Sequence, residues 1–537
     1  MSKNLSELSA RQGLKNNLFE NLAKTDVNKK NIAKEFLIGS ASVTGTMSFY
    51  DFLKDENKNK KVYVCNGSAC LCAGTQGKLT TQLTKYYDED EIGHMTCLGR
   101  CHENSAFHIN GNNYSALSNK QIDDVINNNP LNLGNDHYQS DSIGIKVLTN
   151  TTLTAQLIIQ AFQKITSQDK LQTLNEIKNS LLRGRGGAGF PIGFKLESAM
   201  NTESEQKYII CNADEGDPGA YSDRYLLEQQ PYSVLFGIMV SAYIVGAQYG
   251  VLYIRAEYPE SITIIDESIK SLNPLMENID FDFQFKIISA QGAYICGEET
   301  ALINSIEGQR PEVRTRPPFP TQQGLFNKPT VVNNVETLAS IYPIVTKGGN
   351  FYAAMGTDKS KGTKLVSLDS FFNKPGIYEV TMGTPLINVF EKLGGGFKSA
   401  IKAVHIGGPL GGIVPVEKFK ELSIDFESFA QQGFLLGHAS VVCIPESFRM
   451  IDYLQHLFTF AAYESCGKCF PCRLGTKRGE ELFTNTIKLG KKIDRELLDD
   501  LLDTLEQGSL CAHGGGIPLP IKNALEYFAD ELKEFIV

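Results

Sequence analysis

Short apolar runs alternate with stretches of helical periodicity through the middle of the chain, which predicts an α/β domain over residues 145–350. Three of the runs have the length of strands, at residues 208–211, 251–255 and 285–288. The uncharged stretch 229–254 is long enough to be weighed as a membrane span. Because it contains Pro231 and a Tyr-Gly pair ending at Gly250, we interpret it instead as a buried helix, a glycine cap and a strand.

A smaller α/β unit precedes this domain and is predicted over residues 61–134. It alternates strands and one helix with two cysteine loops, with the strand at 61–64, the helix near 79–87, the second loop at 96–103 and an apolar segment at 107–111. Residues 1–60 are polar with leucines at helical spacing, and predict a helical arm. The Asn- and Asp-rich residues 127–141 predict a linker.

The chain changes character again after the central domain. Two strands joined by a turn, a helix ending at Gly394 and further strand predict a β-grasp-like module over residues 360–425. Residues 440–537 are helical apart from a group of cysteines, and predict a helical domain. The fold class predicted from the pattern is therefore multidomain α/β.

Composition narrows the functional classes. Charged residues make up 21% and hydrophobic residues 42% of the 537 residues, which argues for a folded globular protein. A net charge of -9 without a basic patch argues against a nucleic-acid partner. No secretory signal is visible, so we expect a cytoplasmic protein without a membrane span. Twelve cysteines in such a protein indicate metal or redox chemistry more than disulfides.

Three of the cysteines follow one another at C-x2-C-x2-C near the C-terminus, and a fourth comes later. This spacing is typical of a [4Fe-4S] cluster with one remote ligand, here Cys466, Cys469, Cys472 and Cys511. A structural zinc site is the alternative, although zinc loops usually come as two C-x2-C pairs.

A second group lies in the N-terminal α/β unit. Two pairs on two loops could bind a [2Fe-2S] cluster, Cys65 with Cys70 and Cys97 with Cys101. The plant-ferredoxin spacing is not met, because Cys72 follows Cys70 after one residue, and we interpret Cys72 as a bystander. Zinc or a redox disulfide are the alternatives.

A glycine-rich segment matches G-x-G-x-x-G and comprises Gly184, Arg185, Gly186, Gly187 and Gly189. A helical pattern precedes it, whereas the dinucleotide fold requires a strand there, and we expect Pro191 and Gly193 to interrupt any helix that follows. Closely spaced glycines still let backbone N–H groups converge on a phosphate, with Lys195 as a countercharge. A plain glycine-rich turn is the alternative.

Polar residues gather where apolar segments end. One set follows the strand at 208–211 and comprises Asn212, Asp214, Glu215 and Asp217. A second segment is interpreted as a strand followed by acids at a helix N-terminus, with Tyr294, Gly297, Glu298 and Glu299. Further downstream come Arg316, Phe319, Asn333, Asn334 and Thr337. Together these residues predict one cofactor pocket, because carboxylates are costly to bury without a ligand, although a solvated acidic turn is possible for the first set.

These motifs occur in an order that resembles a known family. They are GRGGAGFPIGFK, CNADEGDPGAYSDR, YICGEETAL with EGQRPEVRTRPPFP, VVNNVETL, and ESCGKCFPCRLG with SLCAHG. Residues 145–537 resemble the NADH-binding, FMN-containing subunit of respiratory complex I and its relatives, the diaphorase subunits of NAD-reducing hydrogenases and NAD-dependent formate dehydrogenases. Residues 60–130 resemble the thioredoxin-like [2Fe-2S] domain that complex I carries as a separate subunit, and this fusion favours the hydrogenase and formate dehydrogenase branch.

The resemblance implies a thioredoxin-like [2Fe-2S] domain, an FMN-binding α/β domain with an atypical Rossmann-like fold, a β-grasp domain of the SLBB type and a helical bundle with [4Fe-4S]. It places the FMN phosphate on residues 184–189 with Lys195, and the rest of the flavin chain on Asn212, Asp214, Asn333 and Asn334. It also implies a nicotinamide dinucleotide site lined by Glu215, Asp217, Glu299, Phe190 and Phe319, and the two cysteine groups as cluster ligands.

Three residues depart from the family pattern. Asp217 stands where the family has Glu, Arg316 where it has Lys, and Leu196 where it has Trp. The first two keep the charge and change its reach, so they put nucleotide geometry in doubt more than nucleotide binding. The acidic pocket should repel an extra 2′-phosphate, which favours NAD over NADP.

The resemblance implies that the chain is a diaphorase subunit. NAD(H) would exchange a hydride with FMN, and the flavin would exchange single electrons with the clusters, so no catalytic side chain is required. We expect partner subunits, namely a catalytic formate dehydrogenase or hydrogenase subunit and a small [2Fe-2S] subunit. The alternatives are a complex I subunit, a flavin-based electron-bifurcating subunit and, outside enzymes, a zinc-binding assembly scaffold.

Overall fold

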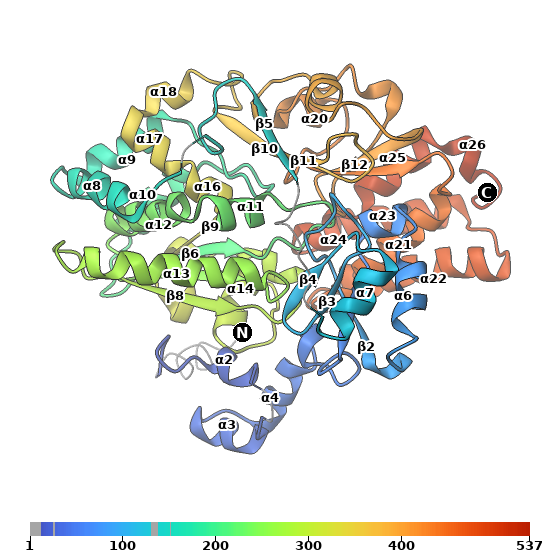
Figure 1. Ribbon diagram of the computed structural model, residues 1–537, viewed down its shortest axis with the longest axis horizontal. Coiled ribbons are helices and arrows are strands. Elements are labelled where there is room, and N and C mark those ends of the chain that lie inside the picture. The colour runs from blue at the N-terminus through green and yellow to red at the C-terminus, as the bar shows by residue number, and fades with distance from the viewer. Residues whose placement is uncertain (1–11, 25–26, 130–137, 151) are drawn as a thin grey trace.

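Three β-sheets with their helices make up the computed structural model, which describes residues 12–24, 27–129, 138–150 and 152–537 (Figure 1). The first sheet belongs to the N-terminal part and has the order β2-β1-β3-β4. Its strands are β1 (Val62–Cys65), β2 (Ile92–Met95), β3 (Phe107–Ile109) and β4 (Asn112–Tyr114), with helices α5 (Ser68–Cys72), α6 (Gln76–Leu83) and α7 (Asn119–Ile126). The predicted helix near 79–87 is thus shorter, since α6 ends at Leu83.

Helices precede this sheet, in the segment predicted as a helical arm. They are α2 (Leu18–Leu22), α3 (Lys29–Glu35) and α4 (Ser40–Met47). Leu14, Leu18 and Leu22 are all buried, so the leucines at helical spacing do face a core. Asn17 fixes the arm to the central domain, because its side-chain amide donates to the carbonyl of Ile306 over 2.8 Å.

The central sheet is fully parallel and has the order β8-β7-β6-β9. Its strands are β6 (Tyr208–Ala213), β7 (Tyr249–Ile254), β8 (Gln284–Ser289) and β9 (Thr330–Asn334). The helices around it are α8 (Ala155–Thr166), α9 (Lys170–Asn179), α10 (Ile192–Asn201), α11 (Ser222–Gln229), α12 (Pro231–Val245), α13 (Pro259–Met276), α14 (Glu299–Ile306), α15 (Pro320–Gln323), α16 (Val335–Ala339), α17 (Ile341–Lys347) and α18 (Gly349–Ala353). Three strands occur where apolar runs predicted them.

The uncharged stretch 229–254 forms helix α12 followed by strand β7, as interpreted from the sequence. The cap is Gly246, in the left-handed conformation at φ 75°, whereas Gly250 lies inside the strand. A Cβ on Gly250 would lie 2.4 Å from a methyl carbon of Ile238, so glycine is needed there for α12 to approach the sheet. No helix in the described part of the chain is long and apolar enough to cross a membrane.

The third sheet has six strands in the order β13-β12-β14-β10-β11-β5. Its strands are β10 (Thr363–Leu368), β11 (Gly376–Thr381), β12 (Ile401–Ile406), β13 (Gly412–Pro415), β14 (Ser440–Pro445) and β5 (Gln139–Ile143), with the short helices α19 (Leu386–Asn388) and α20 (Phe426–Gln431). The sheet therefore includes two strands from outside the predicted module at 360–425: β5 comes before it in the sequence and β14 comes after it.

Strand β5 corrects the predicted linker at residues 127–141, of which 130–137 lie outside the described residues. Residues 139–141 pair with β11 in parallel, and their side chains are exposed at the edge of the sheet. An edge strand with both faces in water shows no hydrophobic alternation, so the pattern could not indicate it.

The last part of the chain is helical as predicted, with α21 (Met450–Tyr463), α22 (Phe470–Leu489), α23 (Arg495–Gly508), α24 (Ala512–Gly516), α25 (Pro518–Tyr527) and α26 (Ala529–Leu532).

Candidate functional site

The carboxyl ends of β6 and β9 bring the predicted amide residues together. The strands are parallel neighbours, and Asn212 lies opposite Asn334 in their register. Asn334 also begins helix α16, because its side-chain oxygen accepts from the backbone N–H groups of Glu336 at 2.9 Å and Thr337 at 3.4 Å. Asn212 donates to the carbonyl of Gly297 over 2.8 Å. Two segments of the predicted pocket therefore meet at one edge of the sheet, where α/β proteins bind ligands.

The glycine segment lies against the start of α16. The backbone N–H of Arg185 donates to the hydroxyl of Thr337 over 2.8 Å, and a Cβ on Gly186 would lie 3.0 Å from the Cβ of Asn334. Gly187 has φ 114° and Gly189 has φ 60°, values that side chains disfavour. The buried guanidinium of Arg185 donates to the hydroxyl of Tyr352 over 3.1 Å, while its Nε and Nη1 have no hydrogen-bond partner among the described residues.

The expectation that Pro191 and Gly193 would interrupt a following helix is wrong. Helix α10 begins at Ile192, with Pro191 in the capping position, where its missing N–H costs nothing. Gly193 lies inside the helix. A larger residue would clash there, because a Cβ would lie 2.8 Å from the Cγ of Lys178. The segment therefore connects two helices and still opens one, as anion-binding glycine loops do.

Charged side chains from three elements form a network beside the loop. Lys195 of α10 donates to Glu299 over 3.0 Å and to the carbonyl of Val332 over 2.9 Å. Arg316 pairs with Glu298 at 3.0 Å and with Glu299 at 3.1 Å. Glu298 caps helix α14, so the acids do lie at a helix N-terminus. The preceding residues, Tyr294–Gly297, form a 3-10 turn and not the strand that the pattern indicated.

Exposed aromatic rings lie close to this network in the sequence. Phe190, Phe194 and Phe319 are 47%, 61% and 52% exposed, and the rings of Phe190 and Phe194 meet edge-on with centroids 5.7 Å apart. Exposed apolar side chains that touch one another are a common feature of binding surfaces, and Phe190 and Phe194 form such a pair. Phe194 was not among the predicted site residues, although it lies in the quoted glycine motif.

The carboxylates that follow β6 are buried. Burial raises the pKa of Asp214, Glu215 and Asp217, and Asp217 accepts a hydrogen bond from the hydroxyl of Tyr294 over 2.7 Å. Within the described residues, Oδ2 of Asp214 and Nδ2 of Asn333 are buried without a hydrogen-bond partner. Unpaired buried acceptors and donors are costly, and the hydroxyl groups of a ribityl chain would satisfy both. The residues present therefore fit FMN.

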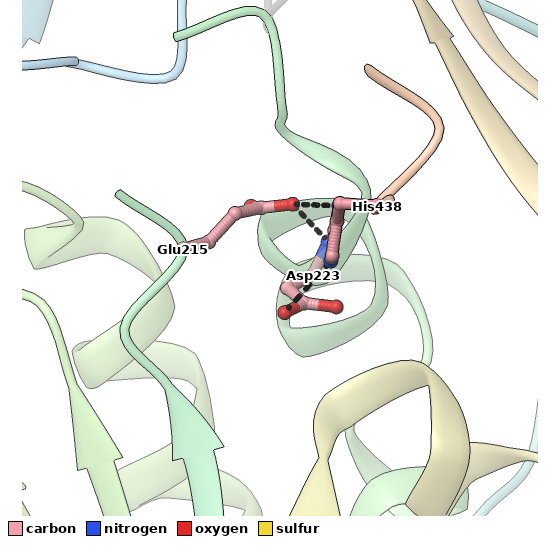
Figure 2. Close-up of side chains that lie close together, drawn as sticks. All are labelled: Glu215, Asp223 and His438. Carbon is pink, nitrogen blue, oxygen red and sulfur yellow. Dashed lines mark hydrogen bonds and ion pairs between the residues drawn. The ribbon is translucent and has the colours of Figure 1, made fainter. Parts of the chain in front are cut away.

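Several functional residues were missed by the sequence reasoning. Figure 2 shows that His438, from the loop before β14, lies between Glu215 and Asp223. Arg255, at the end of β7, donates to the backbone carbonyl of Glu215 and pairs with Glu257 at 2.8 Å. Asp223 was in a quoted motif, and Arg255 ended a predicted strand. His438 belongs to no motif and ends no predicted strand, so no comparable signal in the sequence indicated it.

The four N-terminal cysteines come together as predicted from their spacing. The Sγ atoms of Cys97 and Cys101 lie 3.2 Å apart. The thiol of Cys70 raises the pKa of Cys65, and the thiol of Cys97 raises the pKa of Cys101. All four are buried, and four converging thiols are a suitable donor set for a two-iron cluster. Cys72 is also buried, and burial and the nearby carboxylate of Asp369 raise its pKa.

The C-terminal cysteines also converge. Burial and the neighbouring thiols of Cys469, Cys511 and Cys466 raise the pKa of Cys472 to about 12. Burial likewise raises the pKa of Cys511 to about 11, with Cys466 as a further contributor. Cys469 and Cys511 are the N-caps of α22 and α24, so helix N-termini point at the thiol group and favour negative charge there. The arrangement fits a [4Fe-4S] cluster.

The acidic loop after β6 contacts the first cysteine group directly and is linked to the second through Tyr294. The backbone N–H of Gly219 donates to the Sγ of Cys101 over 3.2 Å. At the other end, Tyr294 holds Asp217 through its hydroxyl, and its backbone N–H donates to Glu464 over 2.9 Å. Glu464 is two residues before Cys466. The predicted flavin pocket is therefore connected to the segments that carry both candidate clusters.

Three family models match the chain. The "Nuo51 FMN-binding domain" matches residues 177–343, the "NADH-ubiquinone oxidoreductase-F iron-sulfur binding region" matches 452–535, and the "Thioredoxin-like [2Fe-2S] ferredoxin" matches 24–129. The NADP-reducing hydrogenase subunit HndC of Solidesulfovibrio fructosivorans is 40% identical over 70% of this chain and 78% of its own. The chain belongs to the NADH-binding, FMN- and iron–sulfur-containing subunit family.

Longer matches extend through the N-terminal part. The alpha subunit of the NAD-reducing hydrogenase HoxS of Cupriavidus necator is 33% identical over 90% of this chain and 85% of its own. A crystal structure of an NAD+-reducing [NiFe]-hydrogenase in its H2-reduced state covers 97% of this chain and 92% of its own, with a TM-score of 0.87 and 27% identity.

Membership of this family confirms four predictions from the sequence. The family, the fold class and the flavin and iron–sulfur oxidoreductase class are shown. The cofactors FMN, NAD(H), [4Fe-4S] and [2Fe-2S] are confirmed by the matched domains. The FMN-binding match contains the glycine segment and the central sheet, and the other two matches contain the two cysteine groups. The roles of individual residues and the domain boundaries stay predictions.

Proposed function

We propose that the chain is the NAD(H)-linked diaphorase subunit of a hydrogenase complex. The observation that supports this most directly is the acidic loop after β6, which contacts the candidate [2Fe-2S] cysteines through Gly219 and is tied to the [4Fe-4S] segment through Tyr294. FMN held in this pocket would supply hydride exchange with NADH and single-electron exchange with the clusters. A flavin in this pocket would be close to both electron acceptors.

The chain's own residues bind and orient the reactants. Residues 184–189 offer backbone N–H groups to the FMN phosphate, and the amides of Asn212, Asn333 and Asn334 hold the flavin chain. Phe190 and Phe319 offer exposed rings against which the nucleotide can stack. The ligand sets proposed for the clusters are Cys65, Cys70, Cys97 and Cys101 for [2Fe-2S], and Cys466, Cys469, Cys472 and Cys511 for [4Fe-4S].

The long match to a hydrogenase subunit favours the hydrogenase branch. That relative aligns over 90% of the chain, which takes in both the N-terminal cluster unit and the flavin domain. The printed names describe the relatives as hydrogenase subunits, so we propose a catalytic hydrogenase subunit as partner. A formate dehydrogenase partner, a small [2Fe-2S] subunit, the electron-bifurcating alternative and the cytoplasmic location stay predictions.

Reduction of the purified full chain by NADH tests this function. Under anaerobic conditions we expect NADH to bleach the flavin absorbance and to produce EPR signals from both clusters. In Cys511→Ala the flavin should still bleach while the [4Fe-4S] signal is lost. Cys443→Ala, which removes a buried thiol outside both groups, is the matched control and should keep both signals. A chain with flavin and iron present that NADH does not reduce would contradict the proposal.

A further inference from the structure

Glu215, Asp223 and His438 form a buried cluster of side chains that face one another (Figure 2). Their exposed fractions are 5%, 2% and 5%. Nδ1 of His438 lies 3.7 Å from Glu215, and Nε2 lies 3.5 Å from Asp223. Both nitrogens of one ring therefore face carboxylates, which is the arrangement expected around an imidazolium.

Glu215 is held firmly in this cluster. It accepts hydrogen bonds from the backbone N–H of Asp223 at 2.9 Å and from the hydroxyl of Tyr258 at 3.2 Å. By contrast, Oδ1 of Asp223 and Nδ1 of His438 have no hydrogen-bond partner among the described residues. The cluster therefore leaves two buried polar atoms free to contact a ligand.

The other charged groups that face His438 do not balance the carboxylates. Asp217 lies within electrostatic range on the loop after β6, and Lys364 faces the ring from β10. Lys364 is already paired with Glu336, and both side chains are fully buried. Arg255 also stabilises the charge of Asp217, whereas Glu215 and Asp223 are ion-paired with His438. The histidine matters most for these two, because a buried negative charge without a positive partner is strongly destabilising.

Burial alone lowers the pKa of His438, but the carboxylates of Asp223 and Glu215 outweigh it and raise the pKa to about 9. The ring is therefore protonated near neutral pH. His405, which is equally buried but contacts Tyr453 and a backbone carbonyl, has its pKa lowered to about 4 by burial. The carboxylates, and not burial as such, make His438 a cation.

The cluster adjoins the residues predicted to hold the FMN phosphate. The amide nitrogen of Asn334 lies 2.6 Å from Asp223 and 3.5 Å from Nε2 of His438. Gly437, the residue before His438, is the nearest neighbour of a Cβ built on Gly187, at 3.9 Å. An anion on residues 184–189 would consequently lie beside two buried carboxylates.

We propose that His438 is a positioning residue whose positive charge neutralises Glu215 and Asp223 and so lets this acidic pocket take the anionic phosphate of FMN. The inference rests on the proposed function, which places FMN in the pocket. It implies that the protonated ring favours FMN over riboflavin, which has the same ring system but no phosphate. Deprotonation of the ring should weaken FMN binding and leave riboflavin binding unchanged.

Flavin binding to the apoprotein tests the inference without any turnover. Because burial raises the pKa of Glu215 to about 7, the test range starts above it. We expect the FMN affinity of the wild-type chain to fall as pH rises from about 8 to about 10, a range in which a phosphate keeps its full charge. His438→Asn should bind FMN at least about tenfold more weakly at neutral pH and lose this pH dependence. His438→Lys keeps the charge and should retain FMN binding. His405→Asn is the matched control for the loss of a buried histidine.

The outcomes separate the inference from the proposed function. If the wild-type chain binds no flavin, the proposed function is wrong. If the wild type binds FMN and His438→Asn binds it equally well with the same pH dependence, the inference is overturned and the function stands. A divalent metal that is present in the wild type and absent from His438→Asn would also overturn it, because the cluster would then bind that ion and not a proton. An equal loss of riboflavin affinity would show a merely structural role.

Discussion

The glycine segment gives the sharpest test of the pocket, through Gly187→Ala. Gly187 has φ 114°, and the nearest atom to a Cβ there is 3.9 Å away, so the substitution fits sterically and acts through backbone strain. A residue other than glycine in such a conformation costs about 1–3 kcal/mol. If the free variant relaxes to a negative φ and FMN binding restores the positive φ, the same energy weakens FMN affinity by about 5- to 150-fold.

The assay is FMN affinity of the apoprotein by fluorescence, with circular dichroism to check the fold. Gly348→Ala is the matched control, because Gly348 has φ 98° and its built Cβ lies 3.7 Å from a flexible carboxylate of Glu176, outside the predicted site. It should lower stability without changing FMN affinity. The reasoning is refuted if both variants are equally destabilised and Gly187→Ala binds FMN as tightly as the wild type.

Three further predictions follow from particular contacts. Glu299→Gln frees Lys195 and Arg316 from a carboxylate, so kcat/KM for NADPH relative to NADH should rise by about tenfold, and an unchanged ratio would remove Glu299 from the nucleotide site. Cys72→Ala should keep the [2Fe-2S] EPR signal, and a lost signal would make Cys72 a ligand. Glu336→Gln leaves Lys364 buried without a partner and should cost about 3–5 kcal/mol in urea unfolding followed by circular dichroism, whereas replacing both by apolar residues should cost much less.

The central sheet could be predicted because its inner strands, β6 and β7, are almost wholly buried. The apolar runs at β6, β7 and β8 are short and continuous, as expected for parallel strands under helices. Strand β5 shows the limit of the same reasoning, because its polar residues lie at an open edge. The start of α10 was missed for a different reason, since Pro191 breaks a helix in its interior but is tolerated at its start.

The sequence likewise indicated some residues of the candidate site and not others. The cysteine groups were visible because metal ligands need fixed spacing, and the amides were visible because they follow buried strands. His438 was invisible because its partners come from distant segments: Glu215 follows β6 and Asp223 lies in α11. Its role depends on charges that meet only in the folded chain.

The central position of the pocket follows from the parallel sheet. β6 has neighbours on both sides, so the loop that follows it lies in the middle of the edge where ligands bind. Segments from the two ends of the chain pack against this same edge: Arg255 donates to the backbone of Thr96 beside the first cysteine group, and Glu464 accepts from Tyr294 beside the second. Neither cysteine group is close to the flavin domain in sequence. Both are brought to it because the loops at this edge offer the backbone groups and buried charges that they contact, and electrons could then leave the pocket toward either cluster.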